Sequence, residues 1–163
     1  MTDFEHHVAL YSRDLMRFCY KLCGNQHDAE DLFQETWVKA LKNYARYQSD
    51  KSFKTWLFAI CANTFRDTVK EKYRTSKALF QNAEEKERFL HSIPTRNEDI
   101  DLYLDLYDAL HKLPKKHRLV IGLYYFQEFS HREIAQILSI PEGTVASRLN
   151  TAKKLLKRRL SDE

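Results

Sequence analysis

The sequence predicts an all-α protein built from two small helical domains joined by a flexible linker. Apolar residues recur at steps of three and four over most of the chain, which is the spacing of one face of an α-helix. Only three glycines and three prolines interrupt the 163 residues, so long helices are expected. No stretch of useful length alternates apolar and polar residues as a half-buried strand does.

Three helices are expected within residues 1–74. The first has an apolar stripe that begins at Phe4, and it ends at Gly24, since glycine readily takes the left-handed conformation that closes a helix. The third begins after the break at residues 48–50 and becomes basic towards its end. The second has a largely acidic outer face, and its apolar stripe consists of Ala29, Leu32, Phe33, Thr36, Trp37, Ala40, Leu41 and Tyr44. The three stripes can share one core.

Residues 75–99 change character, because they are mostly polar and show only fragments of a helical stripe. We interpret them as the linker. The second domain is expected at residues 100–163. One of its helices follows Pro114, a residue that suits the start of a helix, and another follows Ser130, which forms a capping box with Glu133.

The end of the chain has the pattern of a helix-turn-helix. A short capped helix containing the small residue Ala135 leads through a turn at residues 139–143 into a long helix, whose apolar stripe runs from Val145 to Leu156. The outer face of the long helix is polar and basic, so it can lie in a major groove with its first residues at base edges. The alternative is an ordinary helical hairpin whose basic end is only solvated.

Charge and hydropathy limit the classes of function. Lys and Arg number 27 and Asp and Glu number 23, a net charge of +4 that does not by itself identify a polyanionic partner. No apolar run reaches membrane-spanning length, and the N-terminus lacks a basic stretch followed by an apolar one. We therefore expect a cytoplasmic protein that does not insert into a membrane.

Cysteine and histidine give no sign of a metal or cofactor. The cysteines are an odd number without a CxxC pair, which argues against a disulfide framework and a zinc site, and we interpret them as reduced packing residues. They are Cys19, Cys23 and Cys61. No histidine, His27 included, is expected to meet a cysteine or carboxylate in a plausible metal site.

Three stretches resemble a known family when they are taken together. FSHREIAQILSIPEGTVASRLNTAKKLL resembles region 4 of the extracytoplasmic-function (ECF) sigma factors of bacterial RNA polymerase, which share an E-I-A helix, a turn and a P-x-G-T-V-x-S-R-L segment. DAEDLFQETWVKALKN and SFKTWLFAICANTFRD resemble the region 2 motifs of the same family, in the same order and at the expected separation. The resemblance covers nearly the whole chain apart from the linker.

The resemblance implies a sigma factor with no catalysis of its own. Residues 1–74 would be region 2, which docks on core RNA polymerase and recognises the -10 element, and residues 100–163 would be region 4, which binds the -35 element. It also implies selectivity for good promoters, a role in stress responses, and control by an anti-sigma factor that buries both DNA-binding faces.

For the polymerase, the resemblance implies docking through Asp31, Gln34 and Glu35 on the free face of the second helix. Residues at these spacings share one helix face. The alternative is that this acidic face is only solvated.

For the -10 element, the resemblance implies a site at Asn63, which matches the position that lines the flipped-base pocket of similar ECF factors. An amide can both donate to and accept from a base, aromatic rings stack on unpaired bases, and basic side chains hold the backbone. Those partners would be Trp56, Arg66 and Lys70. As an alternative, Trp56 and Phe53 fit the core stripe as packing residues.

For the -35 element, two sets of residues are implied on the last helix. The base readers would be Thr144, Ser147, Arg148 and Thr151. The phosphate contacts would be Lys153, Lys154, Lys157, Arg158 and Arg159. The family usually carries Lys or Arg after the valine and Arg before the alanine, where this chain has Ala146 and Thr151. Fewer charges on the reading face predict a weaker or altered upstream contact.

Two other functions stay open from the residues alone. A free-standing helix-turn-helix repressor or activator would bind duplex DNA without polymerase, usually as a symmetric dimer. A helical adaptor with no nucleic-acid role would leave the basic stretch 153–159 and the acidic face around residues 31–35 unexplained.

Overall fold

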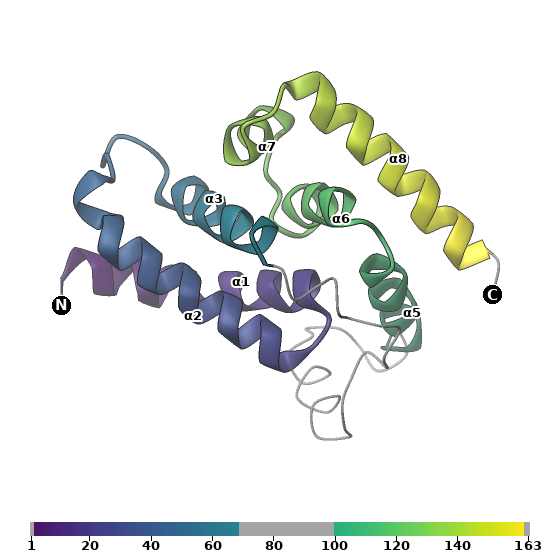
Figure 1. Ribbon diagram of the computed structural model, residues 1–163, viewed down its shortest axis with the longest axis horizontal. Helices are drawn as coiled ribbons and strands as arrows, with labels where there is room; N and C mark the ends of the chain where they lie inside the picture. Colours follow the sequence, from purple (N-terminus) through teal and green to yellow (C-terminus); the bar gives the residue numbers. More distant parts are fainter. Residues whose placement is uncertain (1, 69–99, 162–163) are drawn as a thin grey trace.

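The computed structural model describes residues 2–68 and 100–161, and of residues 100–104 only the backbone (Figure 1). The described residues form helices and turns and contain no strand, which confirms the predicted all-α class. The N-terminal half, residues 2–68, contains α1 (Asp3–Cys23), α2 (Gln26–Asn43), the 3-10 turn Tyr44–Arg46 and α3 (Phe53–Arg66). The C-terminal half, residues 100–161, contains α5 (Ile100–His111), α6 (Lys115–Ile121), the π-helical turn Gly122–Phe126, α7 (His131–Leu138) and α8 (Glu142–Ser161).

Local side-chain chemistry sets the starts of the helices. The side chains of Thr2, Asn25 and Ser52 each accept a hydrogen bond from a backbone N–H in the first turn of the helix that follows, as N-cap residues do. Ser130 and Glu133 form the predicted capping box, with N–O distances of 3.1 and 3.0 Å. The boundaries of these helices therefore follow from short-range sequence signals.

The end of α1 lies where the sequence predicts it, whereas the start of α8 differs from the prediction. Gly24 ends α1 with a φ of 78°, as predicted. The turn before α8 is shorter than predicted, because Glu142 and Gly143 already belong to the helix. The carbonyl of Pro141 accepts hydrogen bonds from the N–H groups of Thr144 and Val145, so the helix starts at once after the proline.

Helices α1, α2 and α3 pack their apolar stripes together, as expected. The three cysteine thiols are free and buried in this half, with the Sγ atoms of Cys19 and Cys61 3.9 Å apart. One stripe residue was predicted wrongly: Leu41 is 60% exposed. Since Ala40 already fills the inner side of α2 at that level, its neighbour Leu41 points outward.

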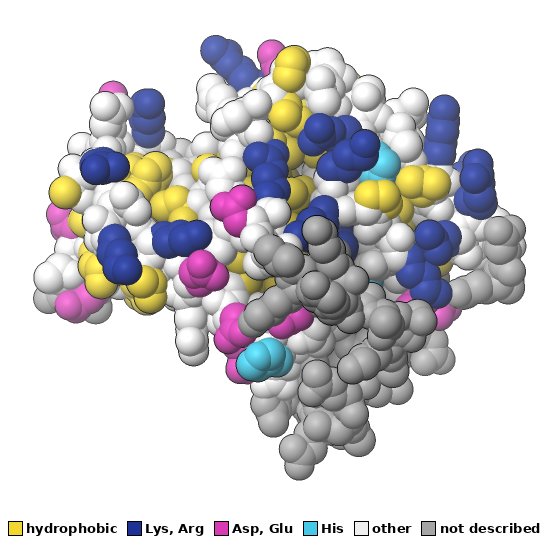
Figure 2. Space-filling model, in the orientation of Figure 1, with side chains coloured by type: hydrophobic (Ala, Val, Ile, Leu, Met, Phe, Trp, Pro, Cys, Tyr) yellow, Lys and Arg dark blue, Asp and Glu magenta, His cyan; other side chains and the backbone are white. Residues whose placement is uncertain are grey.

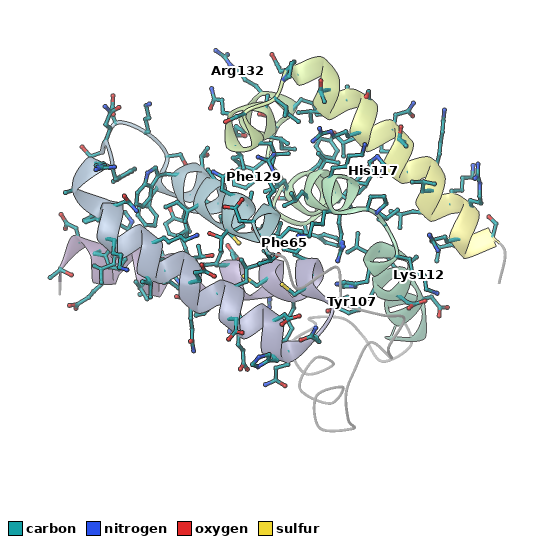
Figure 3. All side chains as sticks on the ribbon, in the orientation of Figure 1. Phe65, Tyr107, Lys112, His117, Phe129 and Arg132 are labelled. Carbon is teal, nitrogen blue, oxygen red and sulfur yellow. The ribbon has the colours of Figure 1, made fainter. Side chains whose placement is uncertain are left out.

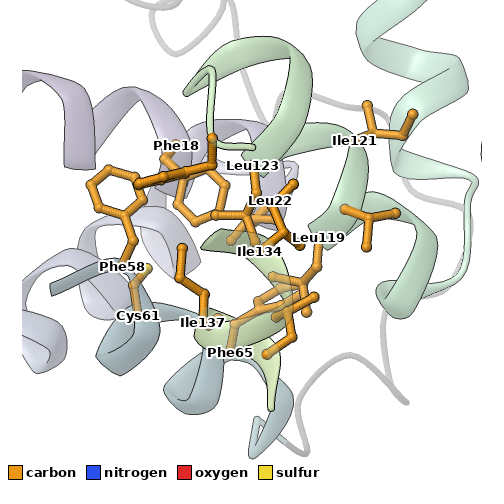
Figure 4. Close-up of a cluster of buried hydrophobic side chains, with 14 of the residues drawn as sticks. Phe18, Leu22, Phe58, Cys61, Phe65, Leu119, Ile121, Leu123, Ile134 and Ile137 are labelled. Carbon is orange, nitrogen blue, oxygen red and sulfur yellow. The ribbon is translucent and has the colours of Figure 1, made fainter. Parts of the chain in front are cut away.

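The two halves also pack on each other, which the sequence did not predict. Figure 1 shows α3 lying between α2 and the helices α6 and α7. The buried side chains form one continuous cluster across both halves (Figure 4). From α1 and α3 come Phe18, Leu22, Phe58, Cys61 and Phe65, and from α6, the π-helical turn and α7 come Leu119, Leu123, Ile134 and Ile137.

In the part of the chain that the structure covers, none of the helices combines the length and the apolar character needed to cross a bilayer.

The capping box predicts a measurable share of the stability. Ser130→Ala removes the acceptor for the Glu133 N–H, so we expect the free energy of unfolding to fall by about 1 kcal/mol. Chemical denaturation followed by circular dichroism measures the change. Glu133→Gln keeps an acceptor oxygen for the Ser130 N–H and should cost clearly less. Equal losses for both variants would contradict the capping assignment.

Candidate docking and nucleic-acid interfaces

The predicted docking residues lie together on the exposed side of α2. Asp31, Gln34 and Glu35 are all exposed, and Figure 2 shows acidic side chains gathered over the first part of this helix. The face continues with two apolar side chains, Val38 and Leu41, which are 49% and 60% exposed. Val38 and Leu41 therefore add a small apolar area beside the carboxylates on the same side of α2.

The first turn of α2 corrects one expectation about histidine. His27, Asp28 and Asp31 have side-chain atoms within 4.8 Å of one another, so a histidine does lie beside carboxylates. These contacts have structural explanations. Asp28 accepts a hydrogen bond from the side chain of Asn25, the N-cap residue, and His27 Nε2 lies 3.4 Å from Asp31 Oδ2, one turn along the helix. Exposed acidic groups of this kind are common without a bound ion.

The predicted -10 residues follow one side of α3. Asn63 is exposed, and its Oδ1 accepts a hydrogen bond from Nη1 of Arg66 at 3.3 Å. Trp56 lies two turns earlier, about 10 Å along the helix axis, and is half-buried. Lys70 lies outside the described residues. The structure thus brings Asn63 and Arg66 together and leaves Trp56 farther along the same side.

Trp56 belongs to an aromatic cluster at the start of α3. Its ring centroid is 5.1 Å from Tyr47 and 5.4 Å from Phe53. Phe53 is buried and stacks on His7 at 3.8 Å, which fits the packing interpretation for Phe53. Tyr47 is a neighbour that sequence reasoning missed. An aromatic residue in the turn between two amphipathic helices is the signal that could have pointed to it.

Helix α8 has the predicted amphipathic arrangement. Val145, Leu149 and Ala152 are buried against the rest of the C-terminal half. Of the predicted base readers, Ser147 and Thr151 are exposed, whereas Thr144 and Arg148 are half-buried. The predicted phosphate contacts are all exposed: Lys153, Lys154, Lys157, Arg158 and Arg159.

Two of these basic side chains already have contacts within the chain. Lys153 Nζ lies 5.5 Å from the ring centroid of Tyr125, and a side-chain hydrogen bond with this tyrosine raises the pKa of Lys153. Arg159 Nη2 donates to the carbonyl of Lys112 at 3.3 Å. Lys154, Lys157 and Arg158 complete the exposed basic end of the helix.

The two candidate nucleic-acid faces meet where α3 approaches α7 and α8. Arg66 Nη2 donates to the carbonyl of Leu138 at 2.9 Å. Burial and the nearby charge of Arg148 lower the pKa of Arg66. Figure 2 shows Lys and Arg side chains grouped in this central area. Cations of both halves are therefore held close together.

His117 on α6 lies beside this basic group, on the side towards α8 (Figure 3). The residue is only 8% exposed, and its Nδ1 has no hydrogen-bond partner within the described part of the chain. Burial lowers its pKa, and the charges of Lys116 and Arg148 lower it further. The folded protein therefore favours the neutral imidazole.

Comparison with known proteins gives matches in both halves. The family described as Sigma-70 region 2 matches residues 7–75, and that described as Sigma-70, region 4 matches residues 103–156. The chain is 32% identical over 163 residues to the ECF RNA polymerase sigma factor SigW of Bacillus subtilis, covering 95% of this chain and 87% of SigW. It is also 32% identical to the ECF RNA polymerase sigma factor SigE of Mycolicibacterium smegmatis, of which it spans 61%.

Solved structures match over the whole chain. The sigma factor RpoE from Bartonella quintana, in complex with the anti-sigma factor NepR, superposes with a TM-score of 0.77 and 25% identity, covering 99% of this chain and 98% of RpoE. CnrH, in complex with the cytosolic domain of CnrY, has a TM-score of 0.72 at 22% identity, which indicates a shared fold.

The buried neutral His117 predicts a loss of stability in mild acid. Its folded pKa lies below the ordinary value of 6.5, so as the pH falls through 6.5 the unfolded chain takes up a proton that the folded chain resists. The free energy of unfolding is therefore expected to decrease on acidification. Urea denaturation between about pH 8 and 5.5 measures this slope.

The variant His117→Gln should make the slope shallower. The pKa of His7 is lowered too, by burial, so some slope will remain, and His7→Gln should remove a separate part of it. A slope identical to wild type in His117→Gln would contradict the assignment.

Proposed function

Because the chain belongs to the ECF sigma factors of bacterial RNA polymerase, we propose that its N-terminal half docks on core polymerase and recognises the -10 element, and that its C-terminal half binds the -35 element. A sigma factor is a transcription initiation factor that directs promoter-specific initiation, and it is not an enzyme. The observation that carries the proposal is the match of both region families, in chain order, to the two halves.

The same observation decides between the alternatives. A free-standing helix-turn-helix regulator needs only the C-terminal half and leaves the region 2 match unexplained. A helical adaptor without a nucleic-acid role leaves both matches unexplained.

The proposed docking site is the α2 face of Asp31, Gln34 and Glu35, extended by Val38 and Leu41. Its exposed carboxylates supply charge for specificity, and its exposed apolar side chains supply area to bury.

The proposed -10 site is the side of α3 that carries Asn63 and Arg66, with Trp56 nearby and Lys70 as a further cation. Asn63 is exposed and has donors and an acceptor for a base edge. Arg66 supplies charge for the backbone of an unpaired strand. Trp56 is half-buried in the aromatic cluster, so we propose that only the exposed part of its ring is available to stack on a base.

The proposed -35 site is the outer face of α8, with Thr144, Ser147, Arg148 and Thr151 at base edges. The exposed basic residues beyond them are placed for phosphate contacts, and such contacts make binding fall with salt.

The proposed partners are core RNA polymerase, promoter DNA and an anti-sigma factor. The structurally similar RpoE of Bartonella quintana forms a complex with the anti-sigma factor NepR, which supports the last of these. Since core polymerase acts in the cytoplasm, we place the site of action there. We further propose that the genes transcribed with this sigma factor serve a stress response.

Docking is tested by co-elution with purified bacterial core RNA polymerase on a sizing column. The wild-type chain should co-elute, and a variant with Asp31→Ala, Gln34→Ala and Glu35→Ala should lose at least about tenfold in affinity, because an interface loses its central polar contacts.

The control for docking is Glu5→Ala combined with Asp105→Ala, which removes two carboxylates from other exposed positions. It should co-elute like wild type. Absence of wild-type binding would contradict the proposed function and favour the free-standing regulator.

Promoter preference is tested at the two departures from the family pattern. Ala146 and Thr151 are exposed on α8, so Ala146→Lys with Thr151→Arg adds two cations to the reading face. We expect tighter upstream binding and a shifted base preference, measured by selection from a randomised -35 library with holoenzyme. An unchanged base preference would contradict the hypothesis that these two positions affect recognition of the -35 element.

A further inference from the structure

Helix α8 has one exposed face that follows from its packing. The helix lies at the edge of the molecule (Figure 1) and packs on α5, α6 and α7. Its buried side chains are Val145, Leu149 and Ala152. Successive residues of a helix are about 100° apart around its axis, so Ser147 projects from the side opposite these three. Asn150 and Thr151 lie beside Ser147, three and four positions further along the chain.

The exposure of the side chains agrees with this geometry. Ser147, Asn150 and Thr151 are all exposed, whereas Arg148 is half-buried. The pKa of Arg66 on α3 is lowered by burial and by the charge of Arg148, which places Arg148 near α3, at the margin of the exposed face. The centre of the face therefore carries polar side chains without charge.

Asn150 differs in chemistry from the other exposed residues in this part of α8. Those residues, up to Thr151, are Glu142, Gly143, Ala146, Ser147 and Thr151. None of them has an amide side chain, which offers N–H donors and a carbonyl acceptor on one planar group. Within the described part of the chain, no hydrogen bond engages the Asn150 amide. Both its donors and its acceptor are therefore available to a ligand.

An amide of this kind matches the major-groove edge of adenine. Adenine presents an acceptor, N7, beside a donor, the N6 amino group, so the amide can donate to the first and accept from the second. Guanine presents two acceptors at the same place, which leaves the amide oxygen unpaired. A Ser or Thr hydroxyl can bond to a donor or to an acceptor and so discriminates less. Among the exposed residues of α8 up to Thr151, Asn150 is thus the one suited to adenine.

The position of Asn150 along the helix also fits a base contact. Asn150 lies eight residues after Glu142, the first residue of α8, which is about 12 Å along the helix axis. In a docked helix-turn-helix, the first part of the second helix meets base edges. The exposed cations Lys154, Lys157 and Arg158 follow in the next turns. Asn150 therefore lies between the start of the helix and the residues proposed to contact phosphates.

We propose that Asn150 is a specificity-determining residue of α8, and that it selects an A·T pair in one orientation within the upstream element through paired hydrogen bonds to N6 and N7 of adenine. The proposal rests on the proposed function, which assigns α8 to the -35 element. It adds a base reader that the sequence prediction left out, and it states which base that residue takes.

The first test is selection from a library randomised in the upstream element, using holoenzyme assembled from the full chain and bacterial core RNA polymerase. At one position, wild type should prefer an A·T pair in one orientation by about tenfold over the other pairs. Asn150→Ala should lose the preference at that position alone. Asn150→Asp keeps the shape but replaces the N–H donors by an acceptor, so the preference should shift towards cytosine, whose N4 amino group donates.

A second readout removes the acceptor on the DNA. Replacing the selected adenine by 7-deazaadenine deletes N7 and keeps the Watson–Crick pairing. The affinity of wild-type holoenzyme should fall about tenfold, whereas the affinity of the Asn150→Ala holoenzyme should not change. The two changes together should then cost no more than either change alone, as expected for two groups in direct contact.

The matched control is Arg158→Ala, an exposed position on the same helix that is assigned to phosphate. It should weaken binding to all sequences about equally, make the salt dependence shallower and keep the base preference. The same selected element for wild type and Asn150→Ala, or an equal effect of 7-deazaadenine on both, would overturn the role of Asn150 alone. Absence of any selected upstream element with wild type would remove the proposed -35 function, and this proposal with it.

Discussion

The burial of Phe18 and Phe65 against α6 and the π-helical turn is the interaction on which the rest of the arrangement depends. Helices α6 and α7 have seven and eight residues, which is too short to be stable alone in water. Helix α7 packs on α3 of the other half and on α8, whereas α6 packs mainly on α8 and makes fewer contacts with α1. The short helices of the C-terminal half are thus packed between α8 and the N-terminal half, and one buried cluster runs through both halves.

Like charges oppose this packing at one edge. Arg66 and Arg148 come from different halves, and the pKa of Arg66 is lowered by burial and by the charge of Arg148. His117 lies in the same area, where burial and the charges of Lys116 and Arg148 lower its pKa. Apolar contact favours the packing of the two halves on each other, and the repulsion between these cations opposes it.

Sequence reasoning succeeded where the signal is local. Gly24, Ser130 with Glu133, and the stripe through Val145 and Leu149 identify helix ends and inner faces from residues a few positions apart. Leu41 was wrongly assigned to the buried side of α2, because an apolar stripe in the sequence does not tell how much of the helix surface the neighbouring helices cover. The contacts between the halves could not be predicted, since the bond from Tyr107 to Tyr20 joins residues 87 positions apart without a local pattern. The pairing of Asn63 with Arg66 follows from helix geometry, whereas the approach of Arg66 to Arg148 depends on how the halves dock.

Hydrogen bonds and buried apolar side chains both contribute to the free energy that holds the two halves together. A hydrogen bond from a charged Arg or Lys side chain to a helix end contributes about 1.5–3 kcal/mol net, and one from a neutral hydroxyl about 1 kcal/mol, because the same groups bond to water when the halves are apart. A buried leucine or phenylalanine contributes about 2 kcal/mol, and several lie in the shared cluster. Arg118 is only 3% exposed, so burying its charge costs hydration energy, which offsets part of its bond to Leu22. Both the polar caps at the helix ends and the apolar cluster therefore hold the halves together, and the caps, whose hydrogen bonds are directional, also fix the angle at which the halves meet.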